Sequence, residues 1–254
     1  MPEQLLLERL CENLTRLQLP HLRENLPAVV RTAETESWSY LRLLDTLFED
    51  EVAAKEQSRI ENAVRAAGLP FLKTLDDFDF PFQPSINRQQ VVNLFELSFL
   101  QRKENIIFLG PPGVGKTHLA VALAVKAVQT GQTIYFTTMA ELVYTLRIDR
   151  ETGRLGRGRR CYKSNLVVVD EVGYTPLERE ECNLFYQFVA LRYEKASTII
   201  TSNKAFDEWA ELFHEPVIVT AILDRLLHHS VVVNIKGNSY RLKGKLDGEV
   251  KPAS

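Results

Sequence analysis

The sequence is poor in cysteine, has no long hydrophobic run and carries almost no net charge, and each of these absences narrows the choice of protein class. The three cysteines, Cys11, Cys161 and Cys182, show no CxxC or Cys/His spacing, which argues against structural zinc and favours a reduced, cytoplasmic setting. No run approaches the ~18 apolar residues of a membrane helix, and the N-terminus lacks the basic region of a signal peptide. The formal net charge of −2 means that any affinity for nucleic acid must come from a local patch.

The 254 residues, of which 45% are hydrophobic, suffice for one large domain or for a medium and a small one. Residues 1–70 read as a small all-helical domain, with leucines at helical spacing and stop signals at Gly68 and Pro70. This domain either packs on the rest of the protein or contacts DNA or another protein, and both interpretations stay open. Residues 71–84 mix phenylalanines with acidic residues and prolines, which is typical of an extended linker.

Residues 85–254 form the third predicted segment, a domain in which short strands alternate with helices. After a helix from Ser85 to about Leu100, five short runs rich in β-branched and aromatic residues read as strands: residues 106–109, 133–137, 165–170, 197–202 and 231–235. This alternation predicts an α/β fold with a five-stranded parallel sheet flanked by helices. Ligands bind at the carboxyl ends of such strands.

A glycine-rich segment, residues 110–117, lies between the first predicted strand and a helix rich in small apolar residues. It fits the phosphate-loop template, in which glycines let backbone N–H groups surround a phosphate, a lysine reaches the β- and γ-phosphates and a Ser/Thr hydroxyl ligates Mg²⁺. The segment therefore predicts a nucleotide site for ATP and Mg²⁺. Its residues and the next one are the candidate nucleotide contacts: Gly110, Pro111, Pro112, Gly113, Val114, Gly115, Lys116, Thr117 and His118.

Polar side chains close two further strands at the same edge of the predicted sheet. Asp170 follows a continuous apolar strand and is placed to hold the metal with Thr117, while Glu171 is placed to activate water against the γ-phosphate. Asn203, which follows the next strand, is a candidate for holding that water or the γ-phosphate, with a helix N-cap as the competing interpretation.

Two arginines and a pair of histidines near the C-terminal end of the sequence are weaker candidates for functional residues. Arg225 or Arg241 could reach the nucleotide of its own or a neighbouring subunit, where a guanidinium suits developing phosphoryl charge. For either arginine alone, a surface salt bridge is the competing interpretation. His228 and His229 have no partner ligand nearby in the sequence and read as surface or interface residues.

Residues 147–163 are locally basic, with seven cationic residues against two acidic ones and a local net charge of +5. Such a segment predicts salt-dependent contact with DNA phosphates, and a solvated loop is the alternative. The candidate DNA-binding residues are Arg147, Arg150, Arg154, Arg157, Arg159, Arg160 and Lys163.

Several motifs together resemble the IstB transposition helper ATPases. They are GPPGVGKTH at residues 110–118, VVVDEVGY at 167–174, TSNK at 201–204, AILDRLLHH at 221–229 and SYRLK at 239–243. LKTLDDFDF at residues 72–80 also fits, so the resemblance covers nearly the whole chain. The phosphate loop alone is generic, whereas DEVGY and DRLLHH are far more specific.

The resemblance implies an AAA+ ATPase close to the bacterial helicase loader DnaC, with ATP bound between subunits of an oligomer on duplex DNA. It implies that the protein remodels target DNA and stimulates a partner transposase. Carried over, Lys116 and Thr117 are Walker A and Asp170 and Glu171 are Walker B. Asn203 is then sensor 1, Arg225 the arginine finger and Arg241 sensor 2, and the basic segment lines the DNA channel. The C-terminal lid is expected to be reduced.

Two other functions compete with a transposition regulator. A helicase loader would use its N-terminal helices to grip a replicative helicase, and pull-downs against each partner separate the two. An ATP-switched adaptor with negligible hydrolysis is the third, and Glu171 argues against it.

Overall fold

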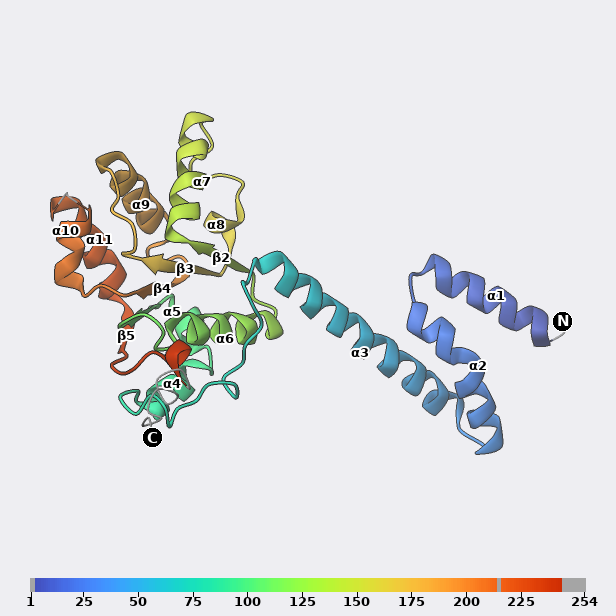
Figure 1. Cartoon of the computed structure of the whole chain (residues 1–254). Helices are drawn as coiled ribbons and strands as arrows, with labels where there is room; N and C mark the ends of the chain where they lie inside the picture. The colour runs from blue at the N-terminus through green and yellow to red at the C-terminus, as the bar shows by residue number, and fades with distance from the viewer. Residues whose placement is uncertain (1–2, 214–215, 244–254) are drawn as a thin grey trace, which may run out of the picture. The chain divides into compact units, whose positions relative to one another are not determined.

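The structure, a computed structural model, describes residues 3–213 and 216–243 (Figure 1). Backbone contacts divide the chain into two compact units, Met1–Asn62 and Ala63–Ser254, so that the division falls inside one long helix. The domain limits at residues 70 and 84, which rest on the sequence alone, stay a prediction. The C-terminal lid falls partly on residues 244–254, outside the described residues.

The first unit is helical, as predicted. It contains α1 (Glu3–Arg16), α2 (Pro20–Thr35) and most of α3 (Tyr40–Ala67). Pro20 occupies the first turn of α2, where its missing N–H costs nothing. A small core forms around Leu22, Leu26 and Leu47. The buried Glu51 carboxylate accepts a hydrogen bond of 2.7 Å from the Leu22 amide, which ties α3 to the start of α2.

The second unit is built on a parallel five-stranded sheet, which confirms the predicted fold class. Its strands lie in the order β2-β3-β4-β1-β5, and every neighbouring pair is parallel. Their bounds are β1 (Asn105–Leu109), β2 (Ile134–Thr138), β3 (Leu166–Val172), β4 (Ser197–Ser202) and β5 (Ser230–Asn234). The predicted strand runs match all five. The central strands β3, β4 and β1 are buried along nearly their whole length because helices cover both faces of the sheet.

Helices cover the sheet on both sides (Figure 1). Helix α6 lies on one face, and α7, α9 and α11 lie on the other, where α9 packs between its two neighbours. The bounds are α4 (Arg88–Leu94), α5 (Ser98–Arg102), α6 (Lys116–Gln129), α7 (Met139–Glu151), α8 (Arg160–Lys163), α9 (Arg179–Arg192), α10 (Trp209–Phe213) and α11 (Pro216–His228). In the part of the chain that the structure describes, no helix combines the length and apolar character needed to cross a membrane.

The helix predicted from Ser85 to about Leu100 is wrong in one respect, because the structure divides it into α4 and α5. The side chain of Asn87 caps α4 by accepting a hydrogen bond from the Gln90 amide. The chain then breaks at Leu97, whose φ is +59°. No glycine or proline marks this break, and the apolar spacing continues across it. Leu94 and Leu97, on either side of the turn, are both buried.

A buried arginine ties α8, α9 and β4 together. Arg192, only 2% exposed, donates hydrogen bonds to the carbonyl oxygens of Cys161, Ser164 and Ser197 and to the Thr198 hydroxyl, at 2.5–3.2 Å. Burial lowers the pKa of this guanidinium to about 10. One side chain thus satisfies three buried main-chain acceptors at the end of the sheet.

Replacing Arg192 with Met should destabilise the second unit by about 3 kcal/mol or more, because each buried acceptor left without a donor costs about 1–3 kcal/mol. For a chain of this size the midpoint of thermal unfolding should fall by roughly 6–12 °C. Lys195→Met, at an exposed position three residues on, is the matched control and should leave the midpoint unchanged. Equal midpoints for both variants would contradict the assignment.

Candidate nucleotide site

The predicted phosphate loop connects β1 to α6, and α6 begins at Lys116, within the motif. Gly113 and Gly115 have φ of +82° and +101°, a region that favours glycine. The loop thus presents turned backbone and the N-terminus of a 14-residue helix to the same point, an arrangement that attracts phosphate.

The loop glycines are also needed for packing. A Cβ on Gly113 would collide with the side chain of Ser239, and one on Gly115 would collide with the ring of Phe78. The Tyr240 amide donates to the Gly113 carbonyl at 2.9 Å. The segment after β5 and the predicted linker are therefore both fitted closely around the loop.

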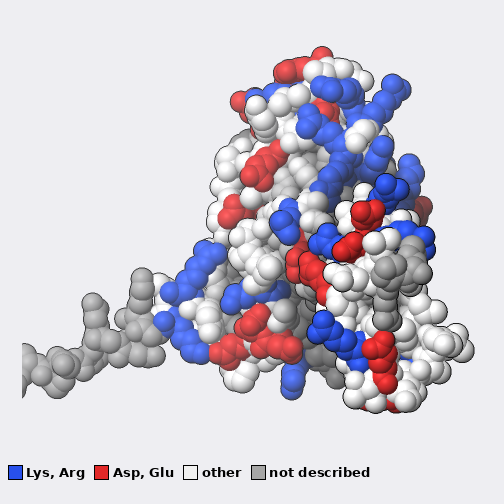
Figure 2. Space-filling view, turned by 90° about the vertical axis from the view of Figure 1, so that its right-hand side faces the viewer, with Lys and Arg blue, Asp and Glu red and all other residues white. Residues whose placement is uncertain are grey.

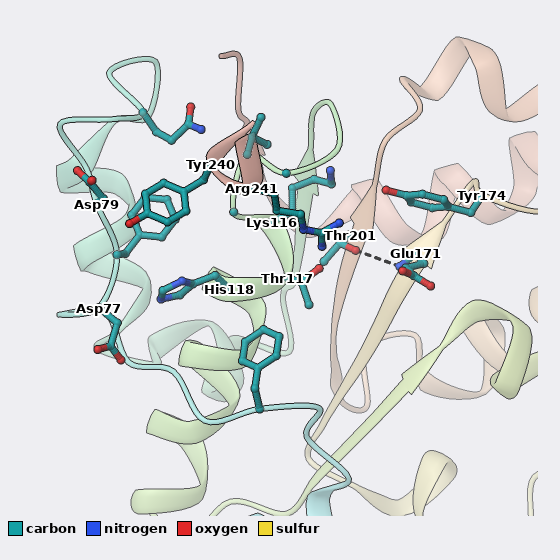
Figure 3. A pocket seen from close by; sticks show the side chains of 16 residues that line it. Asp77, Asp79, Lys116, Thr117, His118, Glu171, Tyr174, Thr201, Tyr240 and Arg241 are labelled. Atoms are coloured by element: carbon teal, nitrogen blue, oxygen red, sulfur yellow. Dashed lines mark hydrogen bonds between the residues drawn. The ribbon is translucent and has the colours of Figure 1, made fainter. Parts of the chain in front are cut away.

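The Lys116 ammonium lies within the loop. Its Nζ donates to the carbonyl oxygens of Gly110 and Pro111 at 2.7 and 2.8 Å. Burial lowers the pKa of Lys116. The negative charge of Asp170 raises this pKa, and the positive charge of Arg241 lowers it further. The ammonium is therefore held where a phosphate would meet it, next to a second cation (Figure 3).

Walker A and Walker B meet directly. The Thr117 hydroxyl lies 3.0 and 3.1 Å from the two carboxylate oxygens of Asp170. A hydroxyl and a carboxylate at this separation are hard oxygen ligands of the kind that bind Mg²⁺ beside a nucleotide phosphate. The residues present therefore fit a magnesium ion held by Thr117 and Asp170.

Thr201 is the site residue that sequence reasoning missed. Its hydroxyl donates to Asp170 Oδ1 and accepts from the Glu171 amide at 3.1 Å, so one side chain contacts the Asp170 carboxylate and the Glu171 backbone (Figure 3). Glu171 has φ +62°, and the pairing of β3 with β4 shifts at this point. Thr201 lies at the polar end of a strand, and this position could have indicated its role. The candidate predicted at this end of the strand was instead Asn203, two residues later.

The phosphate loop lines one end of a pocket. Aromatic and acidic side chains line the other end (Figure 3). The predicted linker lies over it, since His118 Nε2 is 2.9 Å from the Thr74 carbonyl oxygen and the His118 ring meets Phe78 edge-on at 5.2 Å. Asp79 pairs with Lys243 at 2.5 Å, which joins the linker to the chain after β5. The pocket is lined by Phe71, Asp77, Phe78, Asp79, Gln83, Gly113, Val114, Gly115, Lys116, Thr117, His118, Glu171, Tyr174, Thr201, Tyr240 and Arg241.

The three predicted sensor and finger residues lie in different places. Arg241 lines the pocket. Asn203 does not line it: its buried Oδ1 faces the backbone of Gly173 and has no hydrogen-bond partner among the described residues. Arg225 lies on α11, outside the pocket, with its guanidinium 5.0 Å from the centre of the Tyr186 ring.

The basic residues of the predicted DNA-binding segment fall into three groups on α7, α8 and the loop between them. Arg147, Arg150 and Arg159 pair with Glu181, Glu180 and Asp149. Arg160 donates to the carbonyl oxygens of Ala66 and Ile134. Arg154, Arg157 and Lys163 are exposed and have no acidic partner in residues 3–213 and 216–243. Figure 2 shows Lys and Arg side chains gathered in the upper part of the side that it presents, at the height of α7 in Figure 1.

Comparison with known proteins agrees with this site. Residues 12–248 match the family model described as IstB-like ATP binding protein. The chain belongs to this family. It is 46% identical to the ATP-binding protein of insertion sequence IS21 from Pseudomonas aeruginosa. The two match over 233 residues, which are 91% of this chain and 88% of the relative. It is 43% identical over 239 residues to that of IS5376 from Geobacillus stearothermophilus, covering 94% and 95%.

Solved structures share the fold of this IstB-like chain. DnaI matches with a TM-score of 0.52 and 18% identity, over 69% of this chain and 93% of DnaI. DnaA from Aquifex aeolicus, solved with AMPPCP bound, matches with a TM-score of 0.53 and 18% identity, over 72% of this chain and 58% of DnaA. At 18% identity, these likenesses concern the fold alone.

Proposed function

We propose that the protein is an ATP-dependent, DNA-binding regulator of transposition. It assembles on target DNA as an ATP-bridged oligomer, stimulates a partner transposase and hydrolyses ATP to disassemble. The observation that carries the proposal is the contact between Thr117 and Asp170 beside a pocket that Lys116 and Glu171 also line. The names of the relatives, all proteins of insertion sequences, supply the biological setting.

The geometry supports hydrolysis as well as binding. Mg²⁺ held by Thr117 and Asp170 would neutralise charge on the β- and γ-phosphates. The Glu171 carboxylate accepts a proton from water as the water oxygen bonds to the γ-phosphorus, and the bond from that phosphorus to the β,γ-bridging oxygen breaks. Lys116 and Arg241 offset the charge that develops on the phosphate oxygens.

An ATPase assay with and without duplex DNA tests the proposal. Hydrolysis that needs Mg²⁺ and changes on addition of DNA supports it. ATP binding without measurable turnover would instead favour the adaptor, in which the bound state alone carries the signal. A helicase loader is the alternative, but the relatives at 46% and 43% identity are proteins of insertion sequences, which favours transposition.

Oligomerisation through ATP would give Arg225 its role. On α11 its guanidinium lies on the Tyr186 ring and donates to the Ala221 carbonyl at 2.9 Å, outside the pocket of its own chain. As an arginine finger it would therefore act on the nucleotide of a neighbouring subunit.

The helical first unit exposes several apolar side chains, which suit contact with a protein partner: Leu5, Leu6, Leu10, Leu17, Tyr40, Leu41, Leu44, Phe48 and Val52.

Neutralising Arg154, Arg157 and Lys163 to glutamine should weaken duplex DNA binding at all sequences. Within the part of the chain that the structure describes, these cations have no acidic partner to give up, so they can replace counterions on phosphates. The plot of log affinity against log salt should become shallower by about 0.9 for each DNA phosphate that the variant no longer neutralises.

The matched control neutralises three exposed lysines elsewhere, Lys73, Lys126 and Lys236, and so removes the same charge. Its salt slope should equal that of the wild type. Equal slopes for both triple variants would mean that DNA does not meet the α7–α8 loop.

A further inference from the structure

A cluster of two histidines and a glutamate lies at the edge of the sheet opposite the nucleotide pocket. Glu194 is in the turn between α9 and β4, His228 ends α11, and His229 lies between α11 and β5. Since β4 and β5 run parallel to β1, both turns lie at the amino ends of the strands. The proposed ATPase does not use this cluster.

The three side chains converge. His229 Nε2 is 3.6 Å and His228 Nδ1 is 4.0 Å from Glu194 Oε1. One potential ligand atom from each of the three residues falls within 4.8 Å of the other two. The side chains are about half exposed, at 54%, 49% and 55% for His228, His229 and Glu194. Small rotations therefore suffice to close the cluster around one ion.

We propose that Glu194, His228 and His229 bind a first-row transition-metal dication such as Zn²⁺. Two imidazole nitrogens and one carboxylate form a ligand set that proteins use for zinc, with the remaining coordination position open to water. Ligand atoms around a zinc bound at about 2.0–2.1 Å are roughly 3.3 Å apart. Imidazole nitrogen favours zinc, nickel, copper or cobalt over magnesium or calcium.

The backbone that carries the ligands is fixed before any metal arrives. Asn105 donates from its amide to the His229 carbonyl at 2.8 Å and from its side chain to the Leu226 carbonyl at 3.1 Å. The same side chain accepts from the Thr198 amide at 3.0 Å, so one residue joins the starts of β1 and β4 to the end of α11. A site on such a fixed frame loses little entropy when it closes.

Neighbouring groups favour a cation at this place. Asp224 lies one helical turn before His228, and the two side chains line the same surface hollow. The nearby arginine on this helix, Arg225, lies on the Tyr186 ring. The Tyr193 hydroxyl is 2.6 Å from His228 Nδ1, and this hydrogen bond would be exchanged for the metal when it binds.

Calorimetric titration of the full chain with Zn²⁺ tests the proposal. The protein carries no polyhistidine tag, is first treated with EDTA, and is kept in excess Mg²⁺ without nucleotide, so that the Thr117–Asp170 site does not contribute. We expect one saturable site. His228→Ala and His229→Ala should each weaken binding by at least about 10-fold, the loss that even an outer-shell partner of a metal ligand causes.

His21→Ala is the matched control, because it removes an exposed imidazole from α2 and should leave the affinity unchanged. With Co²⁺ in place of Zn²⁺, the wild type should develop visible absorption bands that the His228→Ala/His229→Ala double variant lacks. Circular dichroism and ATP affinity should be unchanged in that variant, which separates this site from the nucleotide pocket. The absence of a saturable site, or equal affinity in the double variant, would overturn the proposal.

Discussion

Glu171→Gln should lower the rate of ATP hydrolysis by about 10²–10⁴-fold, the range that a positioned general base contributes. The amide of glutamine keeps the shape of the side chain but takes up no proton from water. ATP binding should persist, because the variant leaves the phosphate loop intact. Lys116 keeps its contact with the loop and Thr117 its contact with Asp170, while Glu171 is one of the other residues that line the pocket. Steady-state hydrolysis and binding of a fluorescent ATP analogue measure the two effects separately.

The same variant should accumulate the ATP-bound, assembled state on DNA, visible as a larger species in size-exclusion chromatography. Glu96→Gln, an exposed carboxylate between α4 and α5, is the control and should turn over ATP like the wild type. Wild-type turnover in Glu171→Gln would remove its role as base.

The fold was predictable because its strands are distinctive in sequence. In β3 the residues before Asp170 are all apolar because helices cover both faces of the sheet, and the glycines before Lys116 mark the turn that follows β1. The division between α4 and α5 was not predictable, since Leu94 and Leu97 continue the helical spacing across it. The chain nevertheless turns at Leu97, whose φ is +59°, a conformation that the local pattern does not indicate.

The candidate site was predictable only in its linear motifs. Lys116, Thr117 and Asp170 come together as expected, because the carboxyl ends of parallel strands meet at one edge. Thr201 was missed because its role depends on register: β4 stands beside β3, and the Thr201 hydroxyl reaches both Asp170 and the Glu171 amide. Nothing in a single sequence fixes that register.

Charge pairing in the basic segment was also beyond the sequence. Arg147 and Arg150 find their acidic partners on α9, more than 25 residues later in the chain. A count of local charge assigns all seven cations the same role. In the described residues Arg160 is instead held by main-chain carbonyl oxygens, which leaves Arg154, Arg157 and Lys163 as the exposed cations without an acidic partner.

Lys116→Ala should weaken ATP binding by about 10²-fold or more and abolish nucleotide-dependent assembly. Each charge-assisted hydrogen bond from the ammonium to a phosphate contributes about 1.5–3 kcal/mol, and two such bonds account for that weakening. The ammonium lies ready for this role, since the carbonyl oxygens of Gly110 and Pro111 hold it inside the loop at 2.7 and 2.8 Å. Equilibrium binding of a fluorescent ATP analogue in Mg²⁺ measures the change in affinity directly.

Lys126→Ala is the matched control, because it removes an exposed lysine from the last turn of the same helix and should bind ATP normally. Thermal unfolding of both variants separates impaired binding from impaired folding, since Lys116→Ala also leaves the Gly110 and Pro111 carbonyls without their donor. A folded Lys116→Ala protein that still binds ATP with wild-type affinity would contradict the loop assignment. The Thr117–Asp170 pair would then need another role, because a metal held there acts on a phosphate only if the loop beside it binds one.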